Sequence, residues 1–223
     1  MSGNEPQGTR DRILDAAGVI FAKKGFRAAT VRQISEAAGV NVALLHYYFK
    51  DKAGLYQAVL DDLVDQGVKV FPPDMGVRPG DGPEARLAGF VRGLLHRLLS
   101  TRDWGGYDGK ARLIIKELSD PTPFMDQVVE RFARPQKEIL AGIVSELLAP
   151  HAAPRVVRAC CLSVVAQCLH YGYAKPVIDR LLPGEELHDE DIALLAEHVT
   201  RFSLGGLARA KERAARMAAG GGA

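Results

Sequence analysis

One short segment of this 223-residue chain carries side chains that suit contact with a nucleic acid. At helical spacing, four of its residues share one face: Val42, Ala43, His46 and Tyr47. A helix face that only meets water usually carries Lys and Glu, whereas these side chains offer apolar contacts, an imidazole and a hydroxyl. In the major groove of DNA, each base pair displays its own pattern of donors, acceptors and methyl groups. The pattern therefore favours a helix that enters a major groove.

Two short helices joined by a glycine turn are predicted to position that face. Thr30 and Gln33 have the spacing of a capping box, in which each side chain satisfies a backbone N–H of the other, so a helix should begin near Val31. Gly39 is the residue best able to take positive φ just past the end of that helix. Asn41 can then cap a second helix. Residues at helical spacing are expected to face the core: Val31, Ile34, Ala38, Leu45, Tyr48 and Phe49.

These residues resemble the helix-turn-helix of the TetR/AcrR repressors, over about residues 10 to 56. The resemblance rests on small, apolar and aromatic residues and one lysine: Ile34, Ser35, Ala38, Gly39, Val40, Leu45, Tyr48, Phe49 and Lys52. Asn41-Val42-Ala43 and the order LHYYF depart from the commoner pattern and are similar to the CecR (YbiH-like) branch. The resemblance implies that Thr30, Tyr48 and Lys52 hold phosphates, contacts that position a protein without reading sequence.

Other contacts follow from the side chains themselves. Val42 and Ala43 can touch thymine methyls, and His46 or Tyr47 can hydrogen-bond to a base edge or a phosphate. Because one small module makes few contacts, we expect a homodimer on a near-palindromic double-stranded operator. The predicted DNA-binding residues are Thr30, Arg32, Gln33, Asn41, Val42, Ala43, His46, Tyr47, Tyr48 and Lys52.

Composition is that of a well-cored globular chain, with 47% hydrophobic and 25% charged residues. The net charge is only +2, although residues 1 to 55 carry eight Lys and Arg against five acids, a mild local excess. No apolar run approaches the about 18 residues that a membrane span requires, and MSGNEPQGTR lacks the apolar core of a signal peptide. We therefore expect a cytoplasmic protein with no membrane partner.

The remaining periodicity predicts an all-α chain without strands or internal repeats. Thr9 can cap a first helix that stops at Gly25, and Pro135 should kink the helix in which it lies. Further helices are predicted over 51–70, 84–100, 108–119, 123–148, 153–173 and 189–211, with Thr122 and Pro123 at the start of the third from last and a loop over 71–83. The predicted domains are a DNA-binding domain over 9–55 and a ligand-binding and dimerisation domain over 56–211, with flexible tails at 1–8 and 212–223.

The stretch KELSDPTPFMDQVVERFARPQKEIL resembles the C-terminal domain of the CecR branch, which implies helices around a ligand cavity. Cavities of this kind are mostly apolar with a few polar groups. The candidate walls are Phe90, Leu94, Trp104, Ile114, Phe124, Val128 and Phe132, and the candidate polar groups are His96, Lys116, Glu117, Arg131, Gln167, His170 and Tyr171.

HYGYAKPVI and FSLGGL also resemble that branch, and the family resemblance implies that the last two long helices form a four-helix dimer interface. The candidate interface residues are Val157, Cys161, Val164, Val165, Cys168, Leu195, Val199, Phe202, Leu204 and Gly206. The predicted function is that of a homodimeric repressor that releases its operator when a small-molecule inducer binds in the C-terminal domain.

Three alternatives stay open at this point. The same DNA-binding module could serve an activator or a thiol- or metal-responsive switch, although the spacing of Cys160, Cys161 and Cys168 matches no common zinc motif and suits small buried hydrophobes. A helical enzyme could pair Glu117 with Asp120, or His96 with His170, but no spacing demands it. We assign no catalytic residue, no metal ligand and no cofactor.

Overall fold

The computed structural model describes residues 8–100, 111–184 and 188–220, and within them all regular secondary structure is helical. The all-α prediction is confirmed. The helices are α1 (Thr9–Ala28), α2 (Val31–Ala38), α3 (Val42–Phe49), α4 (Lys52–Val70), α5 (Pro83–Leu99), α6 (Ala111–Ser119), α7 (Met125–Val128), the π-helical turn η1 (Val129–Ala133), α8 (Arg134–Leu148), α9 (Pro154–Tyr173), α10 (Lys175–Leu181) and α11 (Asp189–Gly220).

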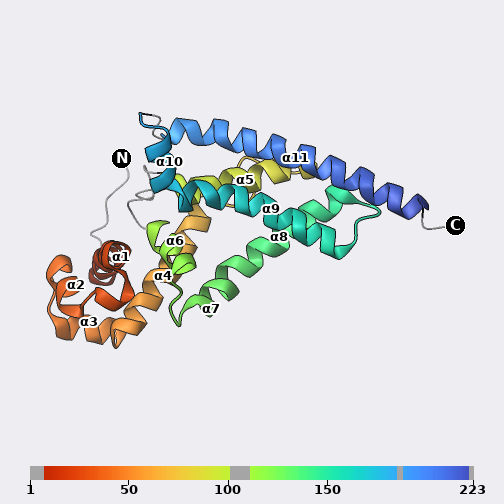
Figure 1. Ribbon diagram of the computed structural model, residues 1–223. Coiled ribbons are helices and arrows are strands. Elements are labelled where there is room, and N and C mark those ends of the chain that lie inside the picture. Colours follow the sequence, from red (N-terminus) through yellow and green to blue (C-terminus); the bar gives the residue numbers. More distant parts are fainter. Residues whose placement is uncertain (1–7, 101–110, 185–187, 221–223) are drawn as a thin grey trace.

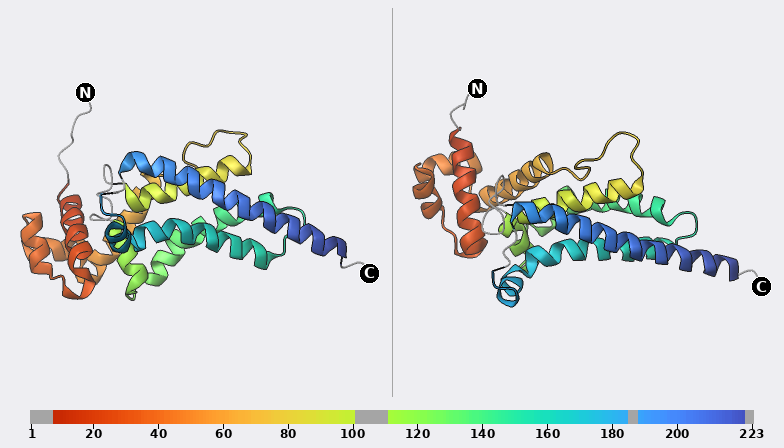
Figure 2. Two further views of the ribbon diagram at one scale, coloured as in Figure 1. Left: turned by 45° about the horizontal axis from the view of Figure 1, so that its top comes forward. Right: turned by 90° about the horizontal axis from the view of Figure 1, so that it is seen from above.

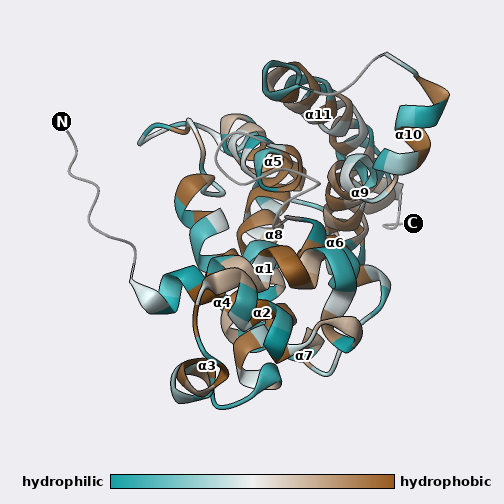
Figure 3. Cartoon of the chain, turned by 90° about the vertical axis from the view of Figure 1, so that its left-hand side faces the viewer, coloured by the Kyte–Doolittle hydropathy of each residue, from teal (hydrophilic) through white to brown (hydrophobic). Residues whose placement is uncertain are grey.

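The first three helices form a small head at one end of an elongated molecule (Figure 1). Their core is built from buried side chains of α1, α2, α3 and the start of α4: Ile13, Phe21, Ile34, Leu45 and Leu55. Seen from the head end, α3 lies at the outer margin and much of its ribbon is coloured as hydrophobic (Figure 3). The head therefore presents an apolar helix at its edge.

Long helices form the body behind the head, where α5, α8, α9 and α11 run side by side (Figure 2). Leu87, Leu95, Leu140, Val164 and Val199 are buried among them. The helix α4 joins the two parts. Asp51 caps it, with the carboxylate accepting a 2.8 Å hydrogen bond from the Gly54 N–H, and the helix then runs unbroken across the predicted domain boundary at residues 55 and 56.

Several helix ends differ from the predictions, and one helix was not predicted. Gly8, not Thr9, is the N-cap of α1, and Gly25 takes φ 78° as expected while the helix resumes beyond it to Ala28. The helix α10 was not predicted. The helix α11 extends past the expected end at residue 211 to Gly220, because the segment RAKERAARMAA is rich in strong helix formers. The predicted tail at residues 1–7 lies outside the described residues.

The helix predicted over 123–148 begins two residues late, at Met125, because Thr122 and Pro123 form a turn in which the Thr122 carbonyl accepts from the Met125 N–H at 3.1 Å. The expected kink at Pro135 takes another form. One extra residue enters the preceding turn, where the Arg134 N–H bonds to the Val129 carbonyl. Pro135 then stands in the first turn of α8, directly after the π-helical turn.

Candidate nucleic-acid interface and ligand cavity

Local hydrogen bonds hold the start of α2 and the turn between α2 and α3. The Thr30 hydroxyl accepts from the Gln33 N–H and the Gln33 side chain accepts from the Thr30 N–H, each at 3.3 Å, which completes the predicted capping box. Gly39 lies in the left-handed region at φ 65°. The Asn41 side chain accepts a 2.7 Å hydrogen bond from the Leu44 N–H. The start of α2, the glycine turn and the start of α3 therefore lie where the sequence predicted them.

The outer face of α3 is open to solvent. Val42, Ala43, His46 and Tyr47 are all exposed, and Tyr47 most of all, at 80%. Tyr48 was expected to face the core and is instead 40% exposed, with its ring 5.3 Å from that of Tyr47. Leu45 and Phe49, one helical turn apart, are buried in the core of the head, and Tyr48 lies to the side of them. The surface is therefore broader and more aromatic than predicted.

His46 is tied to the end of its own helix. Its Nδ1 lies 2.7 Å from the Lys50 carbonyl oxygen, which can only accept a hydrogen bond, so Nδ1 carries the proton. Lys50 itself takes φ 66°, a left-handed conformation that the bond helps to hold. Only Nε2 is then left to meet a base edge or phosphate, and that contact stays a prediction.

Three other predicted DNA contacts are partly engaged within the head. Arg32 forms a 2.9 Å ion pair with Glu36, and both side chains are exposed enough to rearrange. Thr30 keeps its O–H as a donor although its oxygen caps α2. The Lys52 ammonium bonds to the carbonyls of residues 27 and 29 at 3.3 and 3.1 Å, so it braces α4 against the end of α1 and retains one N–H for a phosphate.

A second feature is an apolar cavity of about 310 Å³ inside the body. Five of the predicted wall residues line it: Phe90, Leu94, Ile114, Val128 and Phe132. The other lining residues, which were not predicted as ligand contacts, are Leu63, Val64, Gly67, Arg97, Leu98, Leu118, Met125, Val129, Ala133, Gln136, Lys137, Leu140, Cys161, Leu162, Val165 and Leu169. The cavity thus spans α4 to α9 and reaches the helix that carries the head.

Three residues that were expected to line the cavity lie elsewhere: Lys116, Glu117 and Phe124. Glu117 is 1% exposed and accepts hydrogen bonds from the Tyr56 hydroxyl at 2.8 Å and from the N–H and hydroxyl of Thr122. Phe124 packs on Tyr56, with ring centroids 5.4 Å apart. Lys116 adjoins Gly25, in a separate hollow of about 170 Å³ between α1 and α6. Helical spacing on α6 places Ile114 and Leu118 at the cavity and turns Lys116 and Glu117 away from it. The side chains that are turned away form the joint between head and body.

The other expected polar groups also fall outside the cavity lining. His96 stacks on Phe71, at 5.1 Å between centroids, and Gln167 donates to the Ser203 hydroxyl at 3.1 Å. His170 lies beside Tyr171, at 6.2 Å between ring centroids. Trp104 lies outside the described residues. Of the residues proposed to fix a ligand through polar groups, none that the structure describes lines the cavity.

Arg97 is the polar cavity residue that the sequence prediction missed. It is 6% exposed, donates to the Phe71 carbonyl and, at 3.1 Å, to Gln136, and lies over the Phe132 ring. Burial lowers its pKa from 12.5 to about 10. An arginine inside the apolar run GLLHRLL was the available signal, because its neighbours on both sides belong to the buried face.

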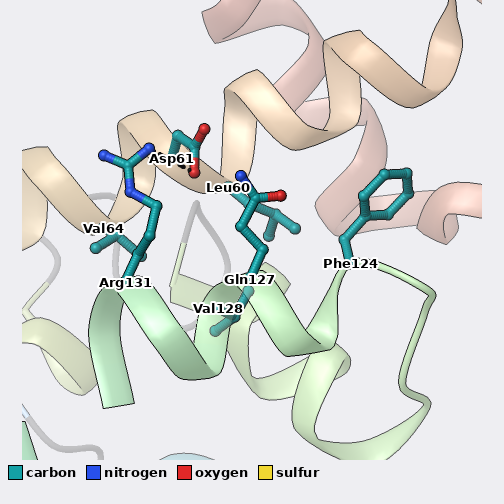
Figure 4. Close-up of a pocket in the computed structure, with 7 residues that line it drawn as sticks. All are labelled: Leu60, Asp61, Val64, Phe124, Gln127, Val128 and Arg131. Atoms are coloured by element: carbon teal, nitrogen blue, oxygen red, sulfur yellow. Dashed lines mark ion pairs between the residues drawn. The ribbon is translucent and has the colours of Figure 1, made fainter. Parts of the chain in front are cut away.

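Arg131 belongs to a small hollow between α4 and the segment α7–η1, which shares Val64 and Val128 with the cavity lining (Figure 4). Its guanidinium pairs with Asp61 at 2.9 Å and with Asp65 at 3.2 Å. Burial raises the pKa of Asp61, and the nearby Arg131 charge opposes that shift. Since Arg131 lies in η1, whose residues Val129 and Phe132 line the cavity, the ion pairs link the cavity wall to α4.

The predicted dimer residues divide into two groups. Cys161, Val164, Cys168 and Val199 are buried within the body core, so they offer no surface to a partner and their assignment is corrected. Their positions on α9 and α11 point toward α5 and α8. The others keep exposed or half-buried side chains: Val157, Val165, Leu195, Phe202, Leu204 and Gly206. Large apolar side chains beside them are also open to solvent, namely Leu162 and Leu194.

The three cysteines are at least partly buried thiols. Burial raises the pKa of each cysteine, to about 12 for Cys168. Within the described ranges, no three His, Cys, Asp or Glu side chains cluster closely enough to hold a metal ion. In the same part of the chain, no helix combines the length and apolar character needed to cross a bilayer.

Comparison with known proteins agrees with this geometry. Residues 13–59 match the family model of the bacterial regulatory proteins of the tetR family, and residues 83–207 match the C-terminal domain of the HTH-type transcriptional dual regulator CecR. A putative transcriptional regulator from Pseudomonas aeruginosa PAO1 has a similar fold, with a TM-score of 0.67, 19% identity and coverage of 92% of this chain and 93% of that one.

Two curated relatives match over shorter stretches. The probable HTH-type transcriptional regulator YttP of Bacillus subtilis is 25% identical over 62% of this chain and 64% of its own length. The HTH-type transcriptional repressor KstR2 of Mycolicibacterium smegmatis is 37% identical over 28% of this chain and 30% of its own length. The chain thus spans less than two thirds of each of these relatives.

The capped two-helix turn with its exposed second helix, on a helical body, defines a helix-turn-helix transcriptional regulator. The chain belongs to the TetR family of bacterial regulatory proteins and carries a CecR-type C-terminal domain.

Proposed function

We propose that this protein is a homodimeric transcriptional repressor that binds a near-palindromic operator through α3 and releases it when a small molecule occupies the body cavity. The observation that carries the proposal concerns α4. Its first residues are tied to the head by the bonds of Lys52 to the carbonyls of residues 27 and 29, while Leu63, Val64 and Gly67 form part of the cavity wall. A ligand that displaces this wall moves the helix that carries the head.

DNA recognition rests on the open face of α3. We propose that Val42, Ala43 and Tyr47 meet base edges, that His46 contributes Nε2, and that Tyr48 and the Thr30 hydroxyl bind phosphates. Arg32, Gln33, Asn41 and Lys52 complete the surface in the proposal. An operator lies on the chromosome, so the proposed site of action is the cytoplasm. No catalytic activity is assigned.

Release of the operator requires that the ligand bind the two arrangements of the heads with different affinity. A coupling of about 1 to 3 kcal/mol would change operator affinity roughly 5- to 150-fold. The proposed dimer uses the exposed apolar side chains of α9 and α11, including Leu162, Leu194 and Phe202. In this arrangement the two heads contact two half-sites on one duplex, one helical turn or a multiple of it apart. Two heads are needed because a single head makes few contacts.

A gel shift with the DNA that flanks the protein's own gene tests whether the outer face of α3 binds DNA. Tyr47→Ala should weaken operator binding by about 1 to 3 kcal/mol, equivalent to roughly 5- to 150-fold. Tyr173→Ala, which removes another exposed aromatic side chain, at the end of α9 and outside the head, is the control and should leave binding unchanged. Affinity should also fall steeply with rising salt, because phosphate contacts release counterions. Binding unaffected by both Tyr47→Ala and salt would refute the proposal.

Activation at some promoters is a second candidate, favoured by one observation. The matched C-terminal model is described as that of a dual regulator. A reporter fused to the bound promoter separates the two: loss of the protein raises transcription if it represses and lowers transcription if it activates. The thiol- and metal-responsive alternatives gain no comparable support, because burial suppresses thiolate formation at the cysteines.

A further inference from the structure

The cavity contains a buried cation, the Arg97 guanidinium, that bonds to neutral groups and, within the part of the chain that the structure describes, to no opposite charge. The Arg97 guanidinium donates to the Phe71 carbonyl and to the Gln136 side-chain oxygen, and its buried Nε–H has no hydrogen-bond partner. Among the residues that the structure describes, no Asp or Glu lines the cavity or pairs with Arg97. Taking a charge out of water without an opposite charge is costly. An anion at Arg97 would remove this penalty.

The geometry of the guanidinium leaves room for such a partner. Of its five N–H groups, two are used within the protein, and Nε–H is among those left. A carboxylate binds an arginine through two parallel hydrogen bonds, a stronger arrangement than any neutral acceptor offers. Lys137, exposed on α8 and also part of the lining, adds a second positive charge near the cavity. Both charged residues of the lining are therefore cations.

Apart from these groups and Gln136, the lining is hydrophobic, from Leu63 on α4 to Leu169 on α9. If each non-hydrogen atom takes up about the 30 Å³ of a liquid water molecule, a cavity of about 310 Å³ holds roughly ten such atoms. A wholly polar anion would leave most of this surface without a partner. The ligand must therefore combine one anionic end with an apolar body.

We propose that the cavity binds a hydrophobic monocarboxylate of medium length, with its carboxylate on Arg97 and its chain among the apolar side chains of α4, α5, α8 and α9. The inference rests on the proposed function of this cavity as the effector site and specifies the chemical class of the effector. Because Arg97 also holds the carbonyl of Phe71, the C-cap residue of α4, a carboxylate at this guanidinium binds a side chain that is bonded to the far end of the helix that carries the head.

Calorimetric titration of the full chain with three probes of equal chain length tests the proposal. Decanoate should bind at least about tenfold more tightly than decan-1-ol, because the hydrogen bonds between its carboxylate and the guanidinium are stronger than the hydrogen bond of a neutral hydroxyl. Decylammonium should bind most weakly, because its charge repels Arg97. Equal binding of decanoate and decan-1-ol, or no binding of either, would overturn the proposal without any variant.

Arg97→Gln then locates the carboxylate. Decanoate should lose its advantage over decan-1-ol, while the affinity for decan-1-ol stays the same. The matched control is Arg92→Gln, because Arg92 also lies on α5 and donates to a backbone carbonyl of the same loop, that of Met75 at 3.1 Å, but lies outside the cavity lining. An advantage of decanoate that survives Arg97→Gln would refute the assignment.

Operator binding without ligand is measured in parallel, so the two proposals can fail separately. A protein that binds its operator but shows no preference for decanoate keeps the proposed function and loses the ligand class. A protein that prefers decanoate through Arg97 but binds no DNA keeps the ligand class and loses the proposed function.

Discussion

The hydroxyl of Tyr56 on α4 donates a 2.8 Å hydrogen bond to the Glu117 carboxylate on α6. Both side chains are buried, and they come from the head-bearing helix and from the body. The same carboxylate accepts the N–H and hydroxyl of Thr122, so Glu117 holds three donors at the joint. Burial and the bond to Glu117 raise the pKa of Tyr56, which keeps the phenol protonated as a donor.

Tyr56→Phe should therefore destabilise the fold. The substitution leaves the buried Glu117 carboxylate short of a donor at a cost of about 1 to 3 kcal/mol, measured as the free energy of unfolding in urea. Tyr173→Phe removes an exposed hydroxyl and is the control, with an expected change within about 0.5 kcal/mol. Equal stability of the two variants would show that the joint does not depend on this bond.

The ion pairs of Arg131 should matter more for coupling than for stability. Arg131→Gln separates η1 from Asp61 and Asp65, and because the pairs are partly exposed the loss of stability should stay below about 1 kcal/mol. Operator affinity should nevertheless change by about fivefold or more, since the cavity wall no longer holds α4. Arg134→Gln, which breaks only the local pair with Glu130, is the control. Unchanged operator affinity in Arg131→Gln would contradict the role in coupling.

The dimer surface can be tested at Phe202. This side chain is 68% exposed on α11 in the single chain, so Phe202→Glu should not disturb the monomer core. It should place a charge in the proposed interface, convert the dimer to a monomer in analytical ultracentrifugation and weaken operator binding. Met217→Glu, another exposed position further along α11, should leave the dimer intact. A Phe202→Glu protein that still sediments as a dimer would place the interface elsewhere.

Cys168 predicts how stability depends on alkaline pH. Burial raises its pKa from 9.0 to about 12, so the unfolded chain loses this proton first as pH rises. The resulting stability is complete below pH 9.0 and is lost as pH rises toward 12. Wild type should lose up to about 1.4 kcal/mol more per pH unit in that window than Cys168→Ala. Parallel slopes in urea titrations across the window would show that the thiol ionises equally in both states.

Local signals made the head predictable. The pairs Thr30–Gln33 and Asn41–Leu44 act over three residues, and the glycine at 39 needs no tertiary context to favour a left-handed turn. Five residues of the cavity wall were predicted from the sequence, among them Phe90, Leu94 and Phe132. Large apolar side chains are buried in most packing arrangements, so their type alone made them candidates. Arg97, the buried charged residue of the cavity, was not predicted. Whether Glu117 or Arg97 faces the cavity depends on how α5 and α6 rotate against α4 and α8, which periodicity alone does not determine.

Tyr48 and the dimer residues illustrate the same limit. Tyr48 lies only one position from Phe49, and one position turns a side chain by about 100° around a helix. The helix α9 is apolar on nearly all sides, so its sequence could not separate Cys168, which is fully buried in the body, from Leu162, which lines the cavity and is 65% exposed. Both sets are hydrophobic, and only the packing of α5 and α8 assigns them.

The extra residue in η1 has a consequence for how such a protein could change its specificity. Deleting one residue from Val129–Ala133 would restore ordinary helical geometry and swing the preceding side chains by about 100° relative to α8. The fit of α8 in the bundle would persist, while Met125 and Val128 would be replaced in the cavity by their neighbours. A single-codon deletion at this turn would thus redesign the ligand contacts and spare the scaffold.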